Sequence, residues 1–127
     1  VPNPLTVTAY DPASDSIVIE SGRGYTVNNQ VKPDIAAPGF ELTCAYPNDR
    51  YGSLTGTGAA AAHAAGTMAM LLEWAVVKGN YTSITGNDIN KLIIRGANRQ
   101  QPVYTYPNNI WGYGKLDIYN VFRKLSL

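Results

Sequence analysis

The stretch from Gly56 to Lys78 constrains the fold of this chain more than any other. It reads GTGAAAAHAAGTMAMLLEWAVVK, and its ionisable residues are His63, Glu73 and Lys78. A helix of this length extends about 35 Å at about 1.5 Å per residue, and this one is apolar nearly all round. Because such a helix is buried on every side, we expect it at the centre of a domain. The Gly79-Asn80 pair predicts its C-terminal end.

Strands are predicted before this helix and two shorter helices after it. Apolar and β-branched residues predict strands over 5–10, 16–20 and 40–45, with a surface loop at 21–33 and a polar turn at 46–53. Thr85 followed by Asp88 resembles a capping box and predicts a helix through Ala97. We expect three residues of this helix to share a face: Ile89, Leu92 and Ile93.

A last amphipathic helix is predicted over 116–125, after an irregular, aromatic segment. We expect its inward face to consist of Leu116, Tyr119, Val121, Phe122 and Leu125. The nine tyrosines of the chain could form a binding face, but packing of the irregular segment is the favoured use.

Composition limits the classes of function. A chain of 127 residues with 45% hydrophobic and 15% charged residues is long enough for one globular domain. Its net charge of +1, with both signs scattered, argues against a nucleic-acid partner. Neither a signal peptide nor a long apolar run with polar flanks is evident, so no membrane partner is expected. With one cysteine, Cys44, and one histidine, we expect no metal site and no cofactor.

The Gly-Thr-Gly turn before the long helix permits three interpretations. Gly56, Gly58 and Ala61 satisfy the dinucleotide-binding pattern G-x-G-x-x-A, but the acidic residue and second strand that this fold needs are missing from the following window. Small residues at this turn could also serve only to pack a helix closely on a sheet. The third interpretation is the strand-turn-helix of a hydrolase that has lost its nucleophile.

The third interpretation is favoured by a resemblance. The segments VKPDIAAPG (31–39) and TGTGAAAAHAAGTMAMLL (55–72) resemble two blocks of the subtilisin-like serine proteases. In that family a K-P-D-x-x-A-P-G segment precedes G-T-S-x-A-x-P-H-x-A-G, whose serine is the nucleophile. The segments LTVTAYD and WGYGKLDIYNVF extend the similarity through most of the chain.

The resemblance assigns roles residue by residue. Gly58 falls at the position of the nucleophilic serine, so its side chain is lost and its backbone N–H could form half of an oxyanion hole. Ala62 replaces a proline found in many members. The remaining matched residues are expected to be structural: Thr55, Gly56, Thr57, Ala60, His63, Gly66, Asp34, Pro38 and Gly39. Asp34 lies in a segment that the family keeps to shape the sheet edge beside the active site.

The rest of the catalytic machinery is not found in these residues. Acyl transfer of this kind needs a hydroxyl, a histidine base and an orienting carboxylate. The family's Asp-x-Gly, His-Gly-Thr-His and oxyanion Asn blocks are absent from the sequence. His63 cannot serve as the base, because five helical residues place it about 140° round from Gly58. Ser53 and Thr57, the hydroxyls nearest the turn, are expected to bond the backbone or cap the helix.

Within the family, the tail RGANRQ...YPNNIWGYGKLDIYNVF is most similar to the Csp group of spore-forming bacteria. Active Csp members process a cortex-lytic proenzyme during germination, and others are pseudoproteases that have lost triad residues. The resemblance therefore implies a bacterial, spore-associated or extracytoplasmic protein. A natural pseudoprotease, an active protease substituted at Gly58, and a non-enzymatic α/β binding module all stay open.

We therefore predict an α/β fold: the C-terminal half of a three-layer subtilisin-like domain, with a mostly parallel sheet and a long buried central helix. Residues 1–127 would form one part of a single domain whose N-terminal half carries the aspartate and histidine blocks. That half is the expected partner, beside a protein or peptide ligand. Without it, the face at 59–70 would stay uncovered and the chain would self-associate.

Overall fold

The computed structural model describes residues 4–18 and 32–125. Strands β1 (Val7–Asp11), β2 (Ser16–Ile17) and β3 (Ile35–Pro38) form one sheet, and β4 (Leu42–Tyr46) and β5 (Arg50–Leu54) form a hairpin. Helix α1 (Thr57–Leu72) continues into a turn of π-helix, η1 (Glu73–Val77). Helices α2 (Gly86–Arg95) and α3 (Ile118–Leu125) follow. The predicted α/β class is confirmed.

The sheet has mixed strand directions. Its order is β2-β1-β3, with β1 parallel to β3 and antiparallel to β2. Beyond β3, the segment around Lys115 adds a parallel bridge, in which the N–H of Ala36 donates to the Gly114 carbonyl at 2.9 Å. The N–H of Leu116 donates to the Ala36 carbonyl at 2.7 Å. A mostly parallel sheet is therefore only partly confirmed.

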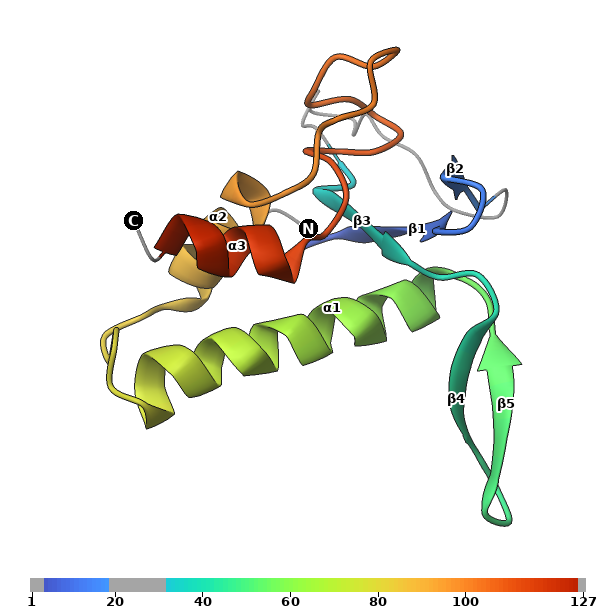
Figure 1. Cartoon of the computed structure of the whole chain (residues 1–127), viewed down its shortest axis with the longest axis horizontal. Coiled ribbons are helices and arrows are strands. Elements are labelled where there is room, and N and C mark those ends of the chain that lie inside the picture. Colours follow the sequence, from blue (N-terminus) through green and yellow to red (C-terminus); the bar gives the residue numbers. More distant parts are fainter. Residues whose placement is uncertain (1–3, 19–31, 126–127) are drawn as a thin grey trace.

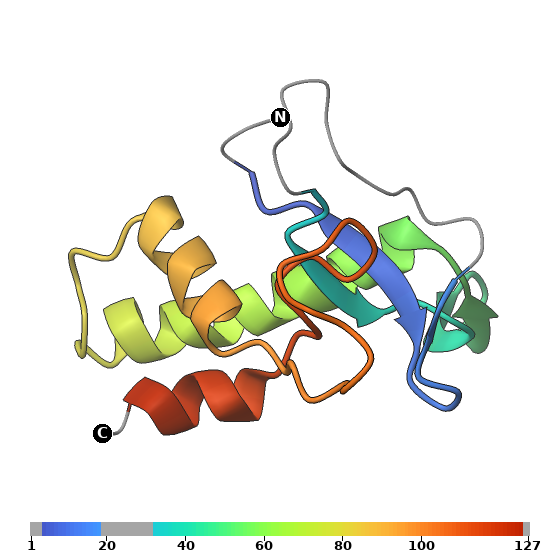
Figure 2. The ribbon, with the colours of Figure 1, turned by 90° about the horizontal axis from the view of Figure 1, so that it is seen from above.

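Helix α1 lies across one face of this sheet, and the irregular segment 98–115 lies over the other (Figure 1). Seen from above, this segment passes over β1 and β3 while α2 and α3 lie beside the sheet (Figure 2). A cluster of small side chains joins the sheet to the start of α1: Ala9, Val18, Ala37 and Ala60. A second cluster joins β3, the end of α1 and the later helices: Ile35, Leu71, Ile89, Ile93, Ala97 and Val121.

The long helix forms as predicted, but it is not buried on all sides. Only one stripe of α1 is buried, formed by Ala60, Ala64, Thr67 and Leu71. The opposite side is exposed at Ala61, Ala62, Ala65, Ala69 and Met70. Burial on every side is therefore not found, and the exposed side lies on the face at 59–70 that was expected to stay uncovered in this chain, because the described residues supply a sheet against only one face.

By length and composition, the 21 residues Thr57–Val77 also meet the criteria for a membrane span, with a mean hydropathy of 1.3. No such span was expected, because no uncharged apolar run of this length with polar flanks is evident in the sequence, and this run contains Glu73. Core helices of water-soluble proteins meet the same criteria, so this finding does not assign a membrane location.

The hairpin differs from the prediction in its second strand. Residues 50–54 pair antiparallel with β4 instead of forming a polar turn, and Leu42 lies opposite Leu54. The turn residues Asn48 and Asp49 have φ values of 64° and 61°. Three residues, 47–49, connect the two strands, since Tyr46 pairs with Arg50, and Asn and Asp tolerate the positive φ values of this turn.

The remaining elements are close to their predicted positions. The segment DIAAPG, for which no element is predicted, forms β3, and residues 19–20 of the predicted second strand lie outside the described residues. Residues 21–31 of the predicted loop also lie outside them. The capping box of α2 is confirmed, since the Thr85 side chain accepts from the Asp88 N–H and the Asp88 carboxylate accepts from the Thr85 N–H.

The expected inward face of α3 is right except at one residue. Val121 is buried, and Leu116, Phe122 and Leu125 pack against the second cluster. Tyr119 is 75% exposed and points away from the core, so its predicted inward position is wrong. An amphipathic pattern does not place a tyrosine reliably, because its hydroxyl tolerates water.

Candidate functional site

The candidate site is the tight turn between β5 and α1. Gly56 is the N-cap of α1 and has a φ of 132°, which side chains rarely adopt. No side-chain hydrogen bond caps this helix, so of the two roles expected for Ser53 and Thr57, backbone bonding or capping, capping is wrong. The Thr55 hydroxyl instead accepts a hydrogen bond from the N–H of Glu41 at 2.9 Å, which fastens the turn to the start of the hairpin.

Gly39 holds this turn against the sheet. Its carbonyl oxygen accepts from the N–H of Gly56 at 2.7 Å, and its own N–H donates to the Tyr10 carbonyl at 2.9 Å. A Cβ on Gly39 would lie 2.5 Å from the Ala9 Cβ and 2.8 Å from the Gly56 oxygen. Glycine at this position is therefore a steric requirement, and Pro38, its neighbour, ends β3 opposite Tyr10.

Gly58 stands at the second residue of α1 and is exposed. An ideal Cβ built on it meets no atom within 4 Å. The N–H groups of a first helical turn have no intrahelical partner and attract negative charge. The turn thus offers open space and backbone donors at position 58, but glycine offers no side-chain group for chemistry.

His63 is exposed on α1. Its backbone carbonyl accepts a hydrogen bond from the Thr67 hydroxyl at 3.2 Å, and Thr67 itself is buried. Helical geometry turns residue 63 about 140° away from Gly58 around the axis. Gly66, one turn further on, is also exposed, and a Cβ there would meet no atom within 4 Å. Nothing in the described part of the chain explains a need for glycine at position 66.

Asp34 ties the N-terminal ends of β1 and β3 together. One carboxylate oxygen, Oδ2, accepts from the Thr6 N–H at 2.8 Å and pairs with the Lys32 ammonium at 2.7 Å. The Gly39 contact with the candidate site lies beyond the other end of β3. Asp34 therefore shapes the sheet at the end of β3 away from Gly58.

Sequence reasoning missed the attachment of the hairpin to the turn. The Thr55–Glu41 bond and strand β5 place the hairpin directly before Gly58 (Figure 1). The turn-forming residues Asn48 and Asp49 could have located the turn, but the mostly polar residues after them gave no signal for a strand.

Other candidate groups contribute no chemistry at this turn. Cys44 is a half-buried free thiol on β4. The Asn80 side-chain amide, in the sequence Asn80-Tyr81-Thr82, donates to the Trp74 carbonyl at 2.9 Å. Across residues 4–18 and 32–125, no group of three or more histidine, cysteine or acidic residues is positioned to hold a metal ion.

Comparison with known proteins agrees with this arrangement. The profile of the subtilase family, Peptidase_S8, matches residues 1–114. The chain belongs to the subtilase family. The solved structure of the Clostridium perfringens CspB protease superposes with a TM-score of 0.94 at 28% sequence identity. That match covers 99% of this subtilase chain and 27% of the CspB chain.

Two characterised relatives match shorter parts of this subtilase chain. The C5a peptidase of Streptococcus pyogenes is 41% identical over 51 residues, which are 40% of this chain and 4% of the relative. The thermostable alkaline protease of Halalkalibacterium halodurans is 35% identical over 81 residues, or 64% of this chain and 19% of the relative. The subtilase chain thus spans only a small part of the length of these relatives.

Proposed function

We propose that this chain is the segment of a subtilisin-like domain that contains the nucleophile position, that Gly58 occupies this position, and that the segment therefore has no hydrolytic activity. The observation that carries the proposal is the geometry at Gly58. Position 58 lies in the first turn of α1, next to a glycine N-cap, and a Cβ at this position would have no atom within 4 Å. A serine would fit there, yet the hydroxyl that attacks a peptide carbonyl is missing.

Within residues 4–18 and 32–125, neither His63 nor Asp34 supplies the other two triad functions at this turn. The single histidine of the sequence, His63, points elsewhere on α1, and Asp34 is engaged at the far end of β3. In the proposed domain, the base and its orienting carboxylate come from a separate N-terminal portion. That portion is also the proposed partner for the exposed side of α1.

A pseudoprotease that acts by binding is the favoured form of this proposal. Its support is Gly58 itself, which supplies no hydroxyl at a turn that keeps open space and a glycine N-cap. The second candidate is a working serine endopeptidase with glycine substituted at position 58, since the open space there accepts a serine without rearrangement. The third, a non-enzymatic α/β binding module, would leave the turn with a packing role alone.

The test is labelling with a fluorophosphonate probe, which reacts with activated serine hydroxyls. We expect no labelling of the purified chain, with an active subtilase labelled in parallel as the positive control. Stoichiometric labelling at Ser53 or Thr57, located by peptide mass mapping, would overturn the proposal, because it would reveal an activated nucleophile beside Gly58.

A further inference from the structure

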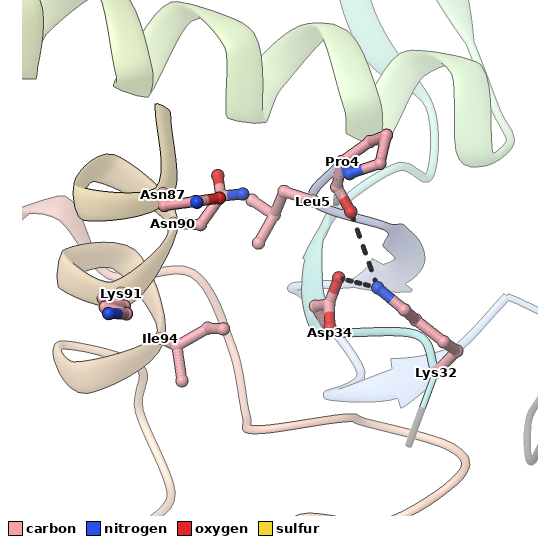
Figure 3. Close-up of a pocket in the computed structure, with 8 residues that line it drawn as sticks. All are labelled: Pro4, Leu5, Lys32, Asp34, Asn87, Asn90, Lys91 and Ile94. Carbon is pink, nitrogen blue, oxygen red and sulfur yellow. Dashed lines mark hydrogen bonds and ion pairs between the residues drawn. The ribbon is translucent and has the colours of Figure 1, made fainter. Parts of the chain in front are cut away.

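A groove separates α2 from the N-terminal ends of β1 and β3 (Figure 3). Two cavities of about 180 Å³ and about 550 Å³ share the same lining residues and form this groove: Pro4, Leu5, Asn87 and Asn90. Its larger part has a volume typical of ligand sites. Because β1 and β3 are parallel, their N-terminal ends lie at the same edge of the sheet, and the groove is at this edge. The candidate turn contacts the chain beyond the C-terminal end of β3, at the opposite edge.

The two walls of the groove differ in character. Asn87, Lys91 and Ile94 recur at helical spacing along one side of α2, whose other side buries Ile89 and Ile93 in the core. The facing wall carries the apolar side chains of Pro4 and Leu5 together with the Lys32–Asp34 ion pair, and Met68 of α1 lines the larger cavity. A groove that combines amide groups with apolar side chains offers an extended polypeptide both hydrogen-bond partners and apolar contacts.

Of the two lysines that line the smaller cavity, one forms an ion pair among the described residues and one does not. Lys32 is neutralised by Asp34 at 2.7 Å and also contacts the Pro4 carbonyl at 3.5 Å. Lys91 interacts electrostatically with Asp88, three residues earlier in α2, but forms no ion pair within the described ranges. An occupant with a carboxylate near Lys91 would complement this charge.

We propose that this groove binds an extended peptide segment whose carboxylate, from its C-terminus or an acidic side chain, is placed at Lys91. The Asn87 amide offers both a donor and an acceptor to the peptide backbone. Every second side chain of the bound peptide would contact Pro4, Leu5 and Met68. This peptide site does not include Gly58 and needs no proteolytic activity. An experiment that rejects peptide binding in the groove therefore leaves the proposed function unaffected.

The test uses two peptides of identical sequence, acetyl-Ala-Leu-Ala-Leu-Ala with a free C-terminal carboxylate and with a C-terminal amide. Each is titrated into the isotope-labelled 127-residue chain and followed by amide chemical shifts. We expect the carboxylate peptide to shift the signals of Asn87, Lys91 and Ile94 and to bind about threefold more tightly than the amide, as suits one exposed ion pair. Equal affinity of the two peptides, or an absence of shifts along α2, would overturn the proposal.

Two charge-reversal variants supply the matched comparison. Lys91→Glu should weaken binding of the carboxylate peptide about tenfold, because attraction becomes repulsion in the groove. Lys78→Glu, at an exposed lysine that does not line the groove, should change it less than twofold. Equal effects of Lys91→Glu and Lys78→Glu would show that peptide binding depends only on the net charge of the chain, which would contradict the proposal. Contacts between residues 1–3 and Ile94 in the free chain would show that the chain fills its own groove, which also contradicts the proposal.

Discussion

The backbone N–H of Gly56 donates to the carbonyl oxygen of Gly39 over 2.7 Å, and this bond joins the two sequence blocks that carry the resemblance to subtilases. Gly39 follows β3 and Gly56 caps α1, so one hydrogen bond couples the end of a core strand to the turn at Gly58. The stability of the turn therefore depends on how closely the backbone at position 39 can approach its neighbours.

Substitution of Gly39 should destabilise the fold far more than substitution of Gly58. In Gly39→Ala the new methyl group would overlap the Ala9 side chain and the Gly56 carbonyl, which should lower the free energy of unfolding by about 1–3 kcal/mol. Gly58→Ala is the matched control, because its methyl group meets open space and alanine favours the helix. Urea unfolding followed by circular dichroism measures both; equal losses would contradict the steric role of Gly39.

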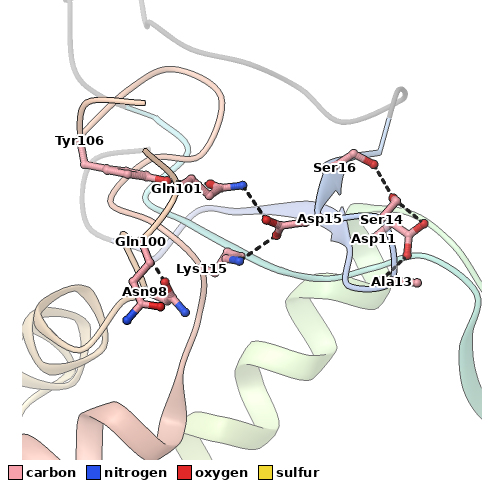
Figure 4. A network of polar contacts seen from close by, with 10 residues as sticks. All are labelled: Asp11, Ala13, Ser14, Asp15, Ser16, Asn98, Gln100, Gln101, Tyr106 and Lys115. Atoms are coloured by element: carbon pink, nitrogen blue, oxygen red, sulfur yellow. Dashed lines mark hydrogen bonds and ion pairs between the residues drawn. The ribbon is translucent and has the colours of Figure 1, made fainter. Parts of the chain in front are cut away.

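The turn between β1 and β2 should hold the segment 98–115 in place (Figure 4). The Asp15 carboxylate pairs with Lys115 at 2.7 Å and accepts from the Gln101 amide at 3.2 Å, while the Tyr106 hydroxyl donates to Gln101 at 2.7 Å. In Asp15→Asn the ion pair is lost, so the amide hydrogens of 98–115 should exchange several-fold faster, in line with an exposed pair worth about 0.2–1 kcal/mol.

Asp49→Asn is the control for this experiment, because Asp49 lies in the exposed tip of the hairpin. It should leave exchange in 98–115 unchanged. Unchanged exchange in Asp15→Asn as well would mean that the packing of Trp111 against Tyr10, with ring centroids 5.7 Å apart, is sufficient to hold the segment.

The capping box of α2 should make stability depend on acid pH. The backbone N–H of Thr85 and the hydroxyl of Tyr81 bond to the Asp88 carboxylate and hold the pKa of Asp88 below its ordinary value. A folded-state pKa below the unfolded value of about 3.9 means that the stabilisation is complete above that value and is lost as the pH falls through the folded pKa.

Asp88→Asn should therefore lower the stability at pH 7, and the difference from the unsubstituted chain should shrink as the pH falls below about 4. Thermal unfolding at pH 7, 5, 4 and 3 measures this difference. A gap that stays constant over the whole range would show that the carboxylate contributes no charge-dependent stabilisation at this cap.

The exposed side of α1 should cause self-association of the chain. Met70 is 53% exposed, and the alanines around it give the helix an apolar surface with no partner among residues 4–18 and 32–125. At about 25 cal/mol per Å², covering roughly 400 Å² of it contributes on the order of 10 kcal/mol before the entropy of association is subtracted.

Light scattering at micromolar concentration tests this expectation. Met70→Lys should shift the chain toward monomer, whereas Val103→Lys should not, although Val103 is 84% exposed and equally apolar. A stable monomer of the unsubstituted chain would contradict the prediction and would show that the chain needs no cover on α1.

The sequence predicted the elements whose residues carry local signals. The apolar run predicted α1, and Thr85 with Asp88 predicted the start of α2, because periodicity and capping act over a few residues. The apolar pattern of α1 does not itself reveal which side a partner covers, and the uncovered face at 59–70 was expected only because the resemblance implies a missing N-terminal half. Tyr119 was misplaced for a related reason, because its ring suits both core and surface.

The candidate site was predictable from resemblance, and its supporting contacts were not. Gly39 and Gly56 were expected to be structural, but the bond between them joins positions 17 residues apart that no short-range rule connects. The Thr55–Glu41 bond depends on the hairpin, whose second strand was predicted as a turn because its residues are mostly polar and exposed. These two hydrogen bonds depend on how the strands and the hairpin are arranged in space, so local sequence patterns do not predict them.

The measurement that tests the central claim most directly is fluorophosphonate labelling of Gly58→Ser, co-expressed with the N-terminal portion of a subtilase whose own activity is verified in the same assay. We predict stoichiometric labelling at position 58 in the complex and none in the isolated variant, because all triad members must be present together. A folded complex, shown by gel filtration and circular dichroism, that carries no label at position 58 would contradict the assignment of Gly58 to the nucleophile position.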